Sequence, residues 1–247
     1  MNLRPGLDPR LYQIGVLTTL LVYGLTVLEF PLAFDVVIGI ALGALGLQWL
    51  AAWWSGTSFE MRSALISVLS LAILLRTDVL WIGVLAGLLA IGSKFAFRSR
   101  GKHLFNPTNF ALVLCTACLP EAWISYGQWG ANVYVALFLA GAGLVVLTQA
   151  SRLDITLAFL GFYAGALVAR AVWLGDPLSI PLHQLQGGSL LIFAFFMISD
   201  PRSTPDSRAG RIVFAALAAG TAIYVQFWMY SPNGLFYGLL GASLATP

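Results

Sequence analysis

The most marked shortage in this sequence is of charged side chains. Asp, Glu, Lys and Arg make up 9% of the 247 residues, whereas 59% of the residues are hydrophobic. Soluble domains carry about 25% charged residues. A single soluble core of this length would not bury so many apolar side chains. The composition therefore excludes a soluble globular domain and predicts a chain that is surrounded by lipid.

Cysteine and histidine are also scarce. The two cysteines, Cys115 and Cys118, form a C-x-x-C pair inside an apolar run, so no disulfide framework is expected. An iron–sulfur or zinc site usually needs about four ligands, which only a symmetric dimer would supply. We therefore interpret the pair as small packing residues. His103 and His183 are predicted on opposite sides of the membrane, which argues against a shared haem. His103 is predicted to lie in a loop beside lipid phosphates.

Other patterns are missing as well. Alternating apolar and polar residues, typical of a membrane β-barrel, do not occur. Apolar runs such as 36–54 and 212–229 are nearly continuous, so helices are predicted. No cleavage site follows the first run, 11–30, which we interpret as a helix rather than a signal peptide. No nucleophile–base triad, phosphate-binding loop or nucleic-acid motif is visible, and no nucleic-acid partner is expected.

The apolar segments predict an all-α polytopic membrane protein, with about ten transmembrane helices in a single domain over 1–247. A complete crossing takes about 20 residues, and the third, fifth, eighth and tenth segments are shorter. Prolines at or near the breaks agree with helix ends there. The predicted helices span residues 11–30, 33–54, 62–75, 79–97, 107–120, 131–149, 153–174, 187–199, 207–229 and 233–246.

The distribution of basic residues predicts the orientation of these helices. With the N-terminus in the cytoplasm, ten crossings leave only Arg76 and Arg170, of 13 Lys and Arg residues, outside. Basic residues concentrate in cytoplasmic loops, so both termini are predicted to be cytoplasmic.

The chain also shows a weak internal repeat. The short third and eighth helices occupy the same position in two groups of five, about 11–120 and 131–246. Residues 71–78 run parallel to 193–200, with Asp78 matching Asp200. Because five is odd, the second group would be inverted in the membrane. Paired short helices in inverted repeats indicate a central binding site.

One polar motif covers Ser93–Phe110 and ends in Asn106-Pro107-Thr108-Asn109-Phe110. Asn106 is a good N-cap and Pro107 suits the first helical position. A basic membrane anchor followed by a capped helix explains the Lys and Arg residues of this segment. It does not explain Asn109 beside Thr108 at membrane depth, where polar residues are costly and indicate function.

A second polar motif covers Gly187–Pro205, where a short Phe-rich helix ends in Ser199-Asp200-Pro201. Thr204-Pro205 offers an N-cap and a first-position proline for the ninth helix. Either this segment is a tight cytoplasmic turn, or it holds a carboxylate and hydroxyls at the inner end of a half-length helix. The residues alone leave both alternatives open.

The stretches G-K-H-L-F-N-P-T-N-F and F-F-M-I-S-D-P-R-S-T-P together resemble the NqrB/RnfD family. Its members are membrane subunits of the sodium-pumping NADH:quinone reductase and of the Rnf electron-transport complex. The resemblance covers nearly the whole chain. The P-N-G-L stretch at 232–235 is similar to small stand-alone homologues. The resemblance implies two inverted five-helix repeats in the bacterial inner membrane, a fold similar to urea and ammonium channels, flavin binding and electron transfer.

The resemblance also implies where a cofactor would bind. Family members with covalent FMN attach it to the threonine of an S-G-A-T-type motif, which this sequence lacks, so covalent FMN is not expected. Riboflavin or FMN bound non-covalently is expected between the two motifs. The expected contacts are Asn106, Thr108, Asn109 and Phe110 from the first motif, Ser199, Asp200 and Thr204 from the second, and Lys102 and Arg202 for a phosphate or a reduced flavin.

Three functions are compatible with these observations. The first is a flavin-binding electron-transfer subunit without independent catalytic activity. Such a subunit would work with other redox subunits or with quinone, and it could also form a homo-oligomer. The second is a transporter or channel for a small solute or for flavin, because the implied fold is channel-like. The third is a structural membrane subunit without a cofactor.

Overall fold

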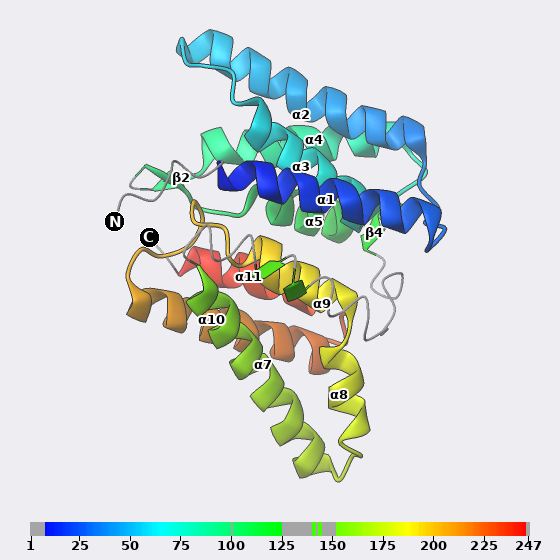
Figure 1. The fold of residues 1–247 in the computed structure, drawn as a ribbon, viewed down its shortest axis with the longest axis vertical. Helices are drawn as coiled ribbons and strands as arrows, with labels where there is room; N and C mark the ends of the chain where they lie inside the picture. Colours follow the sequence, from blue (N-terminus) through cyan, green and yellow to red (C-terminus); the bar gives the residue numbers. More distant parts are fainter. Residues whose placement is uncertain (1–7, 100, 125–139, 142, 145–151, 246–247) are drawn as a thin grey trace.

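The computed structural model describes residues 8–99, 101–124, 140–141, 143–144 and 152–245, which form an α-helical bundle (Figure 1). Every long element is a helix, because runs of apolar residues satisfy their backbone hydrogen bonds within the segment. The helices are α1 (Pro9–Thr26), α2 (Phe34–Ser55), α3 (Met61–Leu74), α4 (Leu80–Ala96), α5 (Pro107–Cys118), α7 (Leu153–Leu174), α8 (Ser179–Leu185), α9 (Gly188–Ile192), the π-helix η2 (Phe193–Met197), α10 (Arg208–Phe227) and α11 (Gly234–Leu244).

Apart from α8, which falls in the predicted loop between the seventh and eighth helices, these helices coincide with the predicted segments wherever the structure describes the chain. The first five predicted helices correspond to α1 to α5, and the last four to α7, α9 with η2, α10 and α11. The predicted helix 131–149 lies almost entirely outside the described residues. Among the described helices, α2, α7 and α10 are long and apolar enough to cross a membrane, and the bent pair formed by α8 and α9–η2 adds a fourth candidate. The shorter apolar helices are α3, α4, α5 and α11.

Two short antiparallel strand pairs mark opposite ends of the first five helices (Figure 1). β1 (Leu75–Arg76) pairs with β4 (Trp123–Ile124), and β2 (Arg98–Ser99) pairs with β3 (Lys102–His103). Buried Arg76 donates hydrogen bonds to the carbonyl oxygens of Ala72, Ile73 and Leu75 at distances of 2.8–3.0 Å. The carbonyls at a helix C-terminus lack intrahelical partners, so Arg76 satisfies the end of α3 inside the protein.

Small residues allow two helix pairs to approach closely. A Cβ atom on Gly87 of α4 would lie 2.3 Å from the carbonyl oxygen of Ile40 on α2, and one on Gly43 would lie 2.2 Å from that of Val84. In the second half, a Cβ on Gly238 of α11 would lie 2.4 Å from the carbonyl oxygen of Ala218 on α10. Backbones in such contact are typical of helix packing in membranes.

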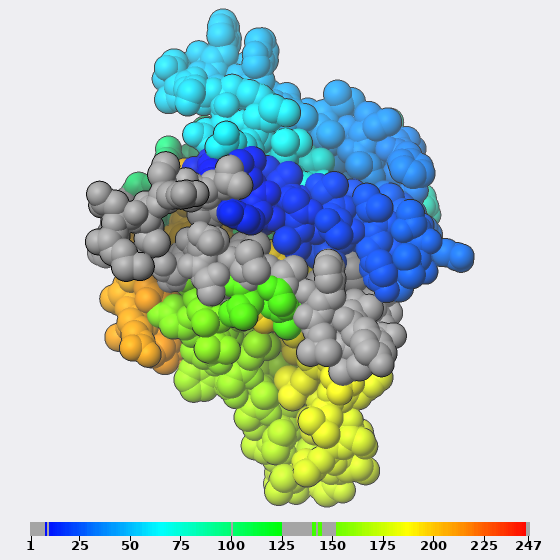
Figure 2. Space-filling view, viewed as in Figure 1, coloured from blue at the N-terminus to red at the C-terminus, as the bar shows by residue number. Residues whose placement is uncertain are grey.

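The outer surface is apolar over long stretches. Figure 2 shows α7 and α8 projecting from the rest of the bundle, and α2 lying along the opposite end. Large apolar side chains are exposed on these helices, including Trp49, Trp53, Trp54, Phe162 and Trp173. In water such a surface would be an aggregation hazard, whereas lipid solvates it.

The eighth predicted helix is the least regular element. It begins with the short α9, changes to the π-helix η2, and ends where the N–H of Ile198 donates to the carbonyl of Phe193 at 3.1 Å. The axis of α8 and that of α9–η2 differ by 50°. π-Turns are frequent at functional sites, and this one leads directly into Ser199 and Asp200.

The prediction that Thr204-Pro205 begins the ninth helix is wrong. Instead α10 begins at Arg208, and the Ser207 hydroxyl accepts a hydrogen bond from the N–H of Gly210 at 3.0 Å. Thr204 lies four residues before α10 begins, and its hydroxyl donates to the carbonyl of Asp200 at 2.8 Å. The N-cap prediction for Asn106 is confirmed: its Oδ1 accepts from the N–H of Asn109 at 3.0 Å.

Candidate functional site

The two polar motifs, far apart in sequence, lie side by side at the end of the bundle that carries β2 and β3. The Asn106 amide donates to the carbonyl of Met197 at 3.3 Å, and the His103 N–H donates to the carbonyl of Arg202 at 3.1 Å. The Lys102 ammonium donates to the carbonyl of Thr204 at 3.2 Å. Hydrogen bonds between backbone and side chains therefore hold the segment before α5 against the segment after η2.

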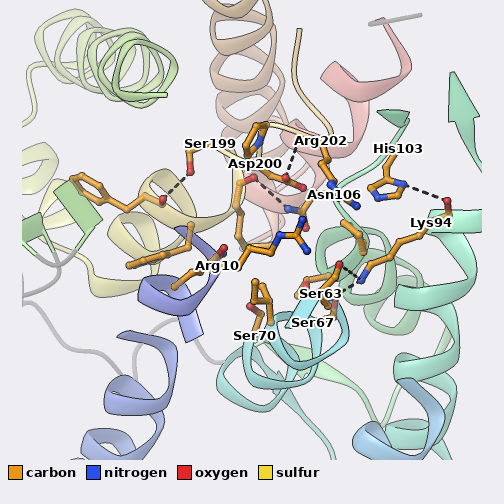
Figure 3. Close-up of a pocket in the computed structure, with 18 of the residues that line it drawn as sticks. Arg10, Ser63, Ser67, Ser70, Lys94, His103, Asn106, Ser199, Asp200 and Arg202 are labelled. Atoms are coloured by element: carbon orange, nitrogen blue, oxygen red, sulfur yellow. Dashed lines mark hydrogen bonds between the residues drawn. The ribbon is translucent and has the colours of Figure 1, made fainter. Parts of the chain in front are cut away.

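A cavity of about 480 Å³ opens beside this junction. Ligand pockets typically have volumes of about 300–1,000 Å³, so this cavity is large enough for a molecule the size of a mononucleotide. Its walls come from α1, α3, α4, the loop before α5, and η2 with the turn that follows it (Figure 3). The polar lining is Asp8, Arg10, Gln13, Ser63, Ser67, Ser70, Lys94, His103, Asn106, Thr108, Ser199, Asp200 and Arg202.

Five of the nine residues predicted for the site line this cavity. They are Asn106, Thr108, Ser199, Asp200 and Arg202. The other four, Lys102, Asn109, Phe110 and Thr204, are not among its lining residues. Lys102 pairs with Asp206, and the ammonium of Lys102 holds the pKa of the Asp206 carboxyl below its usual value. Phe110 packs against Phe97 and Phe105, with ring centroids 5.4 and 5.2 Å away.

Asp200 stabilises the turn after η2 and also lines the cavity. One carboxylate oxygen accepts from the N–H of Arg202 at 3.0 Å, and the other accepts from the Ser203 hydroxyl at 3.1 Å. These bonds fix the turn after η2, as Asp side chains commonly do. The tight-turn interpretation and the lining of a site by a carboxylate and a hydroxyl therefore both apply to this segment.

Asn109 connects the two halves of the chain rather than lining the cavity. It is 1% exposed, and its amide donates to the carbonyl of Phe236 on α11 at 3.0 Å. Its Oδ1 is buried and accepts no hydrogen bond from the described residues. The amide of Asn109 therefore helps to fix α5 against α11 behind the site.

Lys94 is one of the cavity residues that sequence reasoning did not identify. A basic membrane anchor was expected to account for it, but its side chain is buried and its Nζ lies 3.0 Å from the carbonyl oxygen and 3.1 Å from the hydroxyl of Ser63. Ser63, Ser67 and Ser70 line the cavity from one face of α3. Their i, i+4, i+7 spacing in an otherwise apolar helix is a signal that could have revealed this wall.

His103, predicted as a loop residue beside lipid phosphates, lies in the short strand β3 of the segment that connects α4 and α5. It is half-buried in the cavity wall because β2 and β3 turn the loop inward. Its Nδ1 lies 3.2 Å from the carbonyl oxygen of Lys94, and a carbonyl only accepts, so Nδ1 carries the proton. Burial lowers the pKa of His103, and the nearby Asp200 carboxylate opposes this by attracting the protonated form.

The lowered pKa of His103 predicts an acid-sensitive fold. Below the ordinary histidine pKa of about 6.5, the unfolded chain binds a proton more readily than the folded one, so stability is lost as pH falls. Between about pH 7.5 and 5.5 we expect the apparent midpoint of thermal unfolding to fall by roughly 2–4 °C. His103→Gln should flatten this dependence, whereas an unchanged slope would contradict it.

No group of three or more His, Cys, Asp or Glu side chains is close enough to hold a metal ion within the described ranges. Cys115 is buried on α5 and Cys118, at its C-terminal end, is exposed.

Comparison with known proteins identifies the family of the chain. The model of the NQR2, RnfD, RnfE family matches residues 124–247, half of the chain. The chain belongs to the NQR2, RnfD, RnfE family. The matched residues include η2 and the turn at Ser199–Thr204, whereas the first motif lies outside the match. The family model therefore matches a shorter part of the chain than the resemblance predicted, which was nearly the whole chain. Membership of this family and several apolar helices together make the chain a multi-pass α-helical membrane protein.

Two curated family members are similar to part of the chain, and both are RnfD-type subunits of an ion-translocating oxidoreductase complex. The protein from Vibrio atlanticus (strain LGP32) is 30% identical over 128 residues, covering 51% of this chain and 36% of that protein. The protein from Escherichia coli O9:H4 (strain HS) is 31% identical over 112 residues, covering 44% and 31% respectively. The alignments thus span about a third of the length of these relatives.

Proposed function

We propose that this NQR2, RnfD, RnfE family member is a membrane electron-transfer subunit that binds riboflavin or FMN without a covalent bond. The observation that carries the proposal is the cavity formed where the two polar motifs meet. A bound flavin would supply the capacity to accept and donate electrons. The chain itself supplies a binding site and excludes water from part of it.

The lining of the cavity suits a flavin. Phe195, Phe196 and Met197 of η2 give it an apolar wall, which an isoalloxazine ring requires. Asn106, Thr108 and Ser199 bring an amide and two hydroxyls that can bind polar ring edges or a ribityl chain. The amide of Asn106 and the hydroxyl of Ser199 already have backbone partners, which hold both side chains in fixed orientations.

We propose in addition that the chain crosses the bacterial inner membrane ten times as two inverted five-helix repeats, with both termini in the cytoplasm. Corresponding helices make corresponding contacts: α2 packs on α4 as α7 packs on α10, and α4 packs on α5 as α10 packs on α11. α5 and α11 meet between the halves. In this orientation the cavity lies toward the cytoplasm.

The partners follow from the relatives, which are named as subunits of an ion-translocating oxidoreductase complex. We propose that other redox subunits or a quinone exchange electrons with the bound flavin. A second copy of the chain is a further candidate partner.

The interior behind the cavity favours a binding site over a solute channel. Phe159, Phe193 and Phe236 are completely buried, and Phe193 packs against the other two with ring centroids 5.1 and 5.7 Å away. These rings fill the space between η2, α7 and α11 in the second half of the chain, so aromatic side chains occupy this part of the interior.

Flavin binding by the detergent-purified protein tests the proposal. We expect the protein to quench the fluorescence of added FMN or riboflavin in a saturable way. Thr108→Val with Ser199→Ala should weaken binding by about tenfold, because two hydrogen bonds to the ligand are removed. Thr116→Val is the matched control, since Thr116 lies on the same helix and donates to the carbonyl of Leu112. Absence of binding, or solute uptake by proteoliposomes without a bound chromophore, would overturn the proposal.

A further inference from the structure

The cavity contains a buried ammonium group that no described carboxylate contacts. Lys94 is 5% exposed, and its Nζ contacts only oxygens of Ser63, which are neutral. No carboxylate of the described residues lies within 4.0 Å of Lys94. A buried charge without a partner is strongly unfavourable, so a site of this kind favours an anionic ligand.

The carboxylates around the cavity are engaged elsewhere. Asp8 pairs with Arg62, and Glu60 pairs with Arg10. The two oxygens of Asp200 accept hydrogen bonds from its own turn. Asp200 and Glu60 attract the Lys94 ammonium from a distance, but neither forms an ion pair with it.

The groups beside Lys94 are suited to an anion. Ser63 and Ser67 offer hydroxyls on the same wall, and Arg202 lines the cavity without an ion pair to any described carboxylate. Figure 3 shows Lys94, Ser63 and His103 on one side of the cavity and Ser199 on the other. The cavity therefore has a cationic, hydroxyl-rich end and an apolar end.

We propose that the Lys94 end is a phosphomonoester subsite, and that the cavity therefore selects FMN over riboflavin. This inference rests on the proposed flavin site and specifies its ligand. A phosphate monoester carries between one and two negative charges near neutral pH and three acceptor oxygens. Charge-assisted hydrogen bonds from an ammonium and a guanidinium to such oxygens are stronger than neutral ones. Lys94 takes the role that sequence analysis assigned to Lys102, which Asp206 already neutralises.

Paired titrations of FMN and riboflavin into the full chain, purified in a neutral detergent, test the inference. We expect FMN to bind about tenfold more tightly than riboflavin, as a charged hydrogen-bonded contact implies. Lys94→Met should bring the two affinities within about threefold, leaving riboflavin binding intact as evidence of folding, and Lys94→Arg should keep the preference. Arg98→Met removes the same charge from an exposed residue outside the cavity and should leave the preference unchanged.

Competition experiments test whether the phosphate in the subsite belongs to FMN, to free phosphate or to a lipid headgroup. Inorganic phosphate at high concentration should weaken FMN binding and leave riboflavin binding unchanged. Equal affinities for FMN and riboflavin in the wild-type protein would overturn this inference and leave the flavin site standing. Lys94-dependent binding of phosphatidic acid vesicles, with no preference for FMN, would assign the subsite to a lipid headgroup and overturn the FMN assignment. Failure to bind either flavin would overturn the proposed function together with the inference.

Discussion

Replacing Gly87 by alanine is expected to lower the apparent midpoint of thermal unfolding by roughly 5–10 °C, or to prevent folded protein from accumulating. The added methyl carbon would lie 2.3 Å from the carbonyl oxygen of Ile40 and 2.7 Å from the backbone nitrogen of Ala44. Both obstacles are backbone atoms, which cannot rotate away as a side chain can. The backbones of α2 and α4 would therefore have to move apart where they pack at Gly87.

The control for this substitution is Gly46→Ala. Gly46 lies on α2, and nothing stands within 4 Å of the position that its Cβ would occupy. Alanine is also the better helix former, so stability should be unchanged or slightly higher. Thermal unfolding in the same detergent, followed by size-exclusion chromatography, measures both variants. Equal midpoints for Gly87→Ala and Gly46→Ala would show that α2 and α4 do not pack as closely as described.

Replacing Ser67 by phenylalanine is expected to weaken flavin binding by about 100-fold without unfolding the protein. Ser67 is buried in the α3 wall of the cavity, where a benzyl group would occupy space that the ligand needs. The cavity offers room for the ring in the free protein, so the penalty should appear mainly on binding. Flavin fluorescence quenching and the thermal midpoint, measured on the same sample, separate the two effects.

Ser67→Ala distinguishes lost volume from a lost hydroxyl. The Ser67 hydroxyl donates to the carbonyl of Ser63 at 3.3 Å, so its removal should change flavin affinity by less than about threefold. If Ser67→Phe bound flavin as tightly as the wild-type protein, the ligand would have to lie elsewhere.

Much of the fold follows from hydrophobicity and helix-terminal chemistry. Asn106-Pro107 predicts the start of α5 to the residue, because the cap uses only neighbouring atoms. Thr204-Pro205 has a similar pattern but does not start a helix, because α10 begins at Arg208. The Thr204 hydroxyl donates to the carbonyl of Asp200, four residues earlier, and such local side-chain-to-backbone bonds compete with helix capping.

The site is harder to predict because its walls come from distant segments. The two motifs identify Asn106, Thr108 and Ser199 through their polarity at membrane depth. Lys94 looks like a membrane anchor when only its position near a helix end is considered. Its burial depends on Ser63, on a helix that comes earlier in the chain, and that pairing has no signal in the spacing of the motif.

Asn109 shows that polarity at membrane depth does not specify a role. The sequence places it beside Thr108, but the helix turns the two side chains in different directions. Thr108 lines the cavity, whereas Asn109 reaches Phe236 on α11.

The π-helix at Phe193–Met197 has a consequence for how this site could change over evolutionary time. A π-turn holds one more residue than the α-turn it replaces, and each residue of an α-helix advances the chain by about 100°. Deleting one residue from η2 would restore α-helical bonding and rotate Ser199 and Asp200 relative to the cavity. A single-codon insertion or deletion could thus convert a polar pocket wall into an apolar one, while leaving the helices that cross the bilayer unaltered.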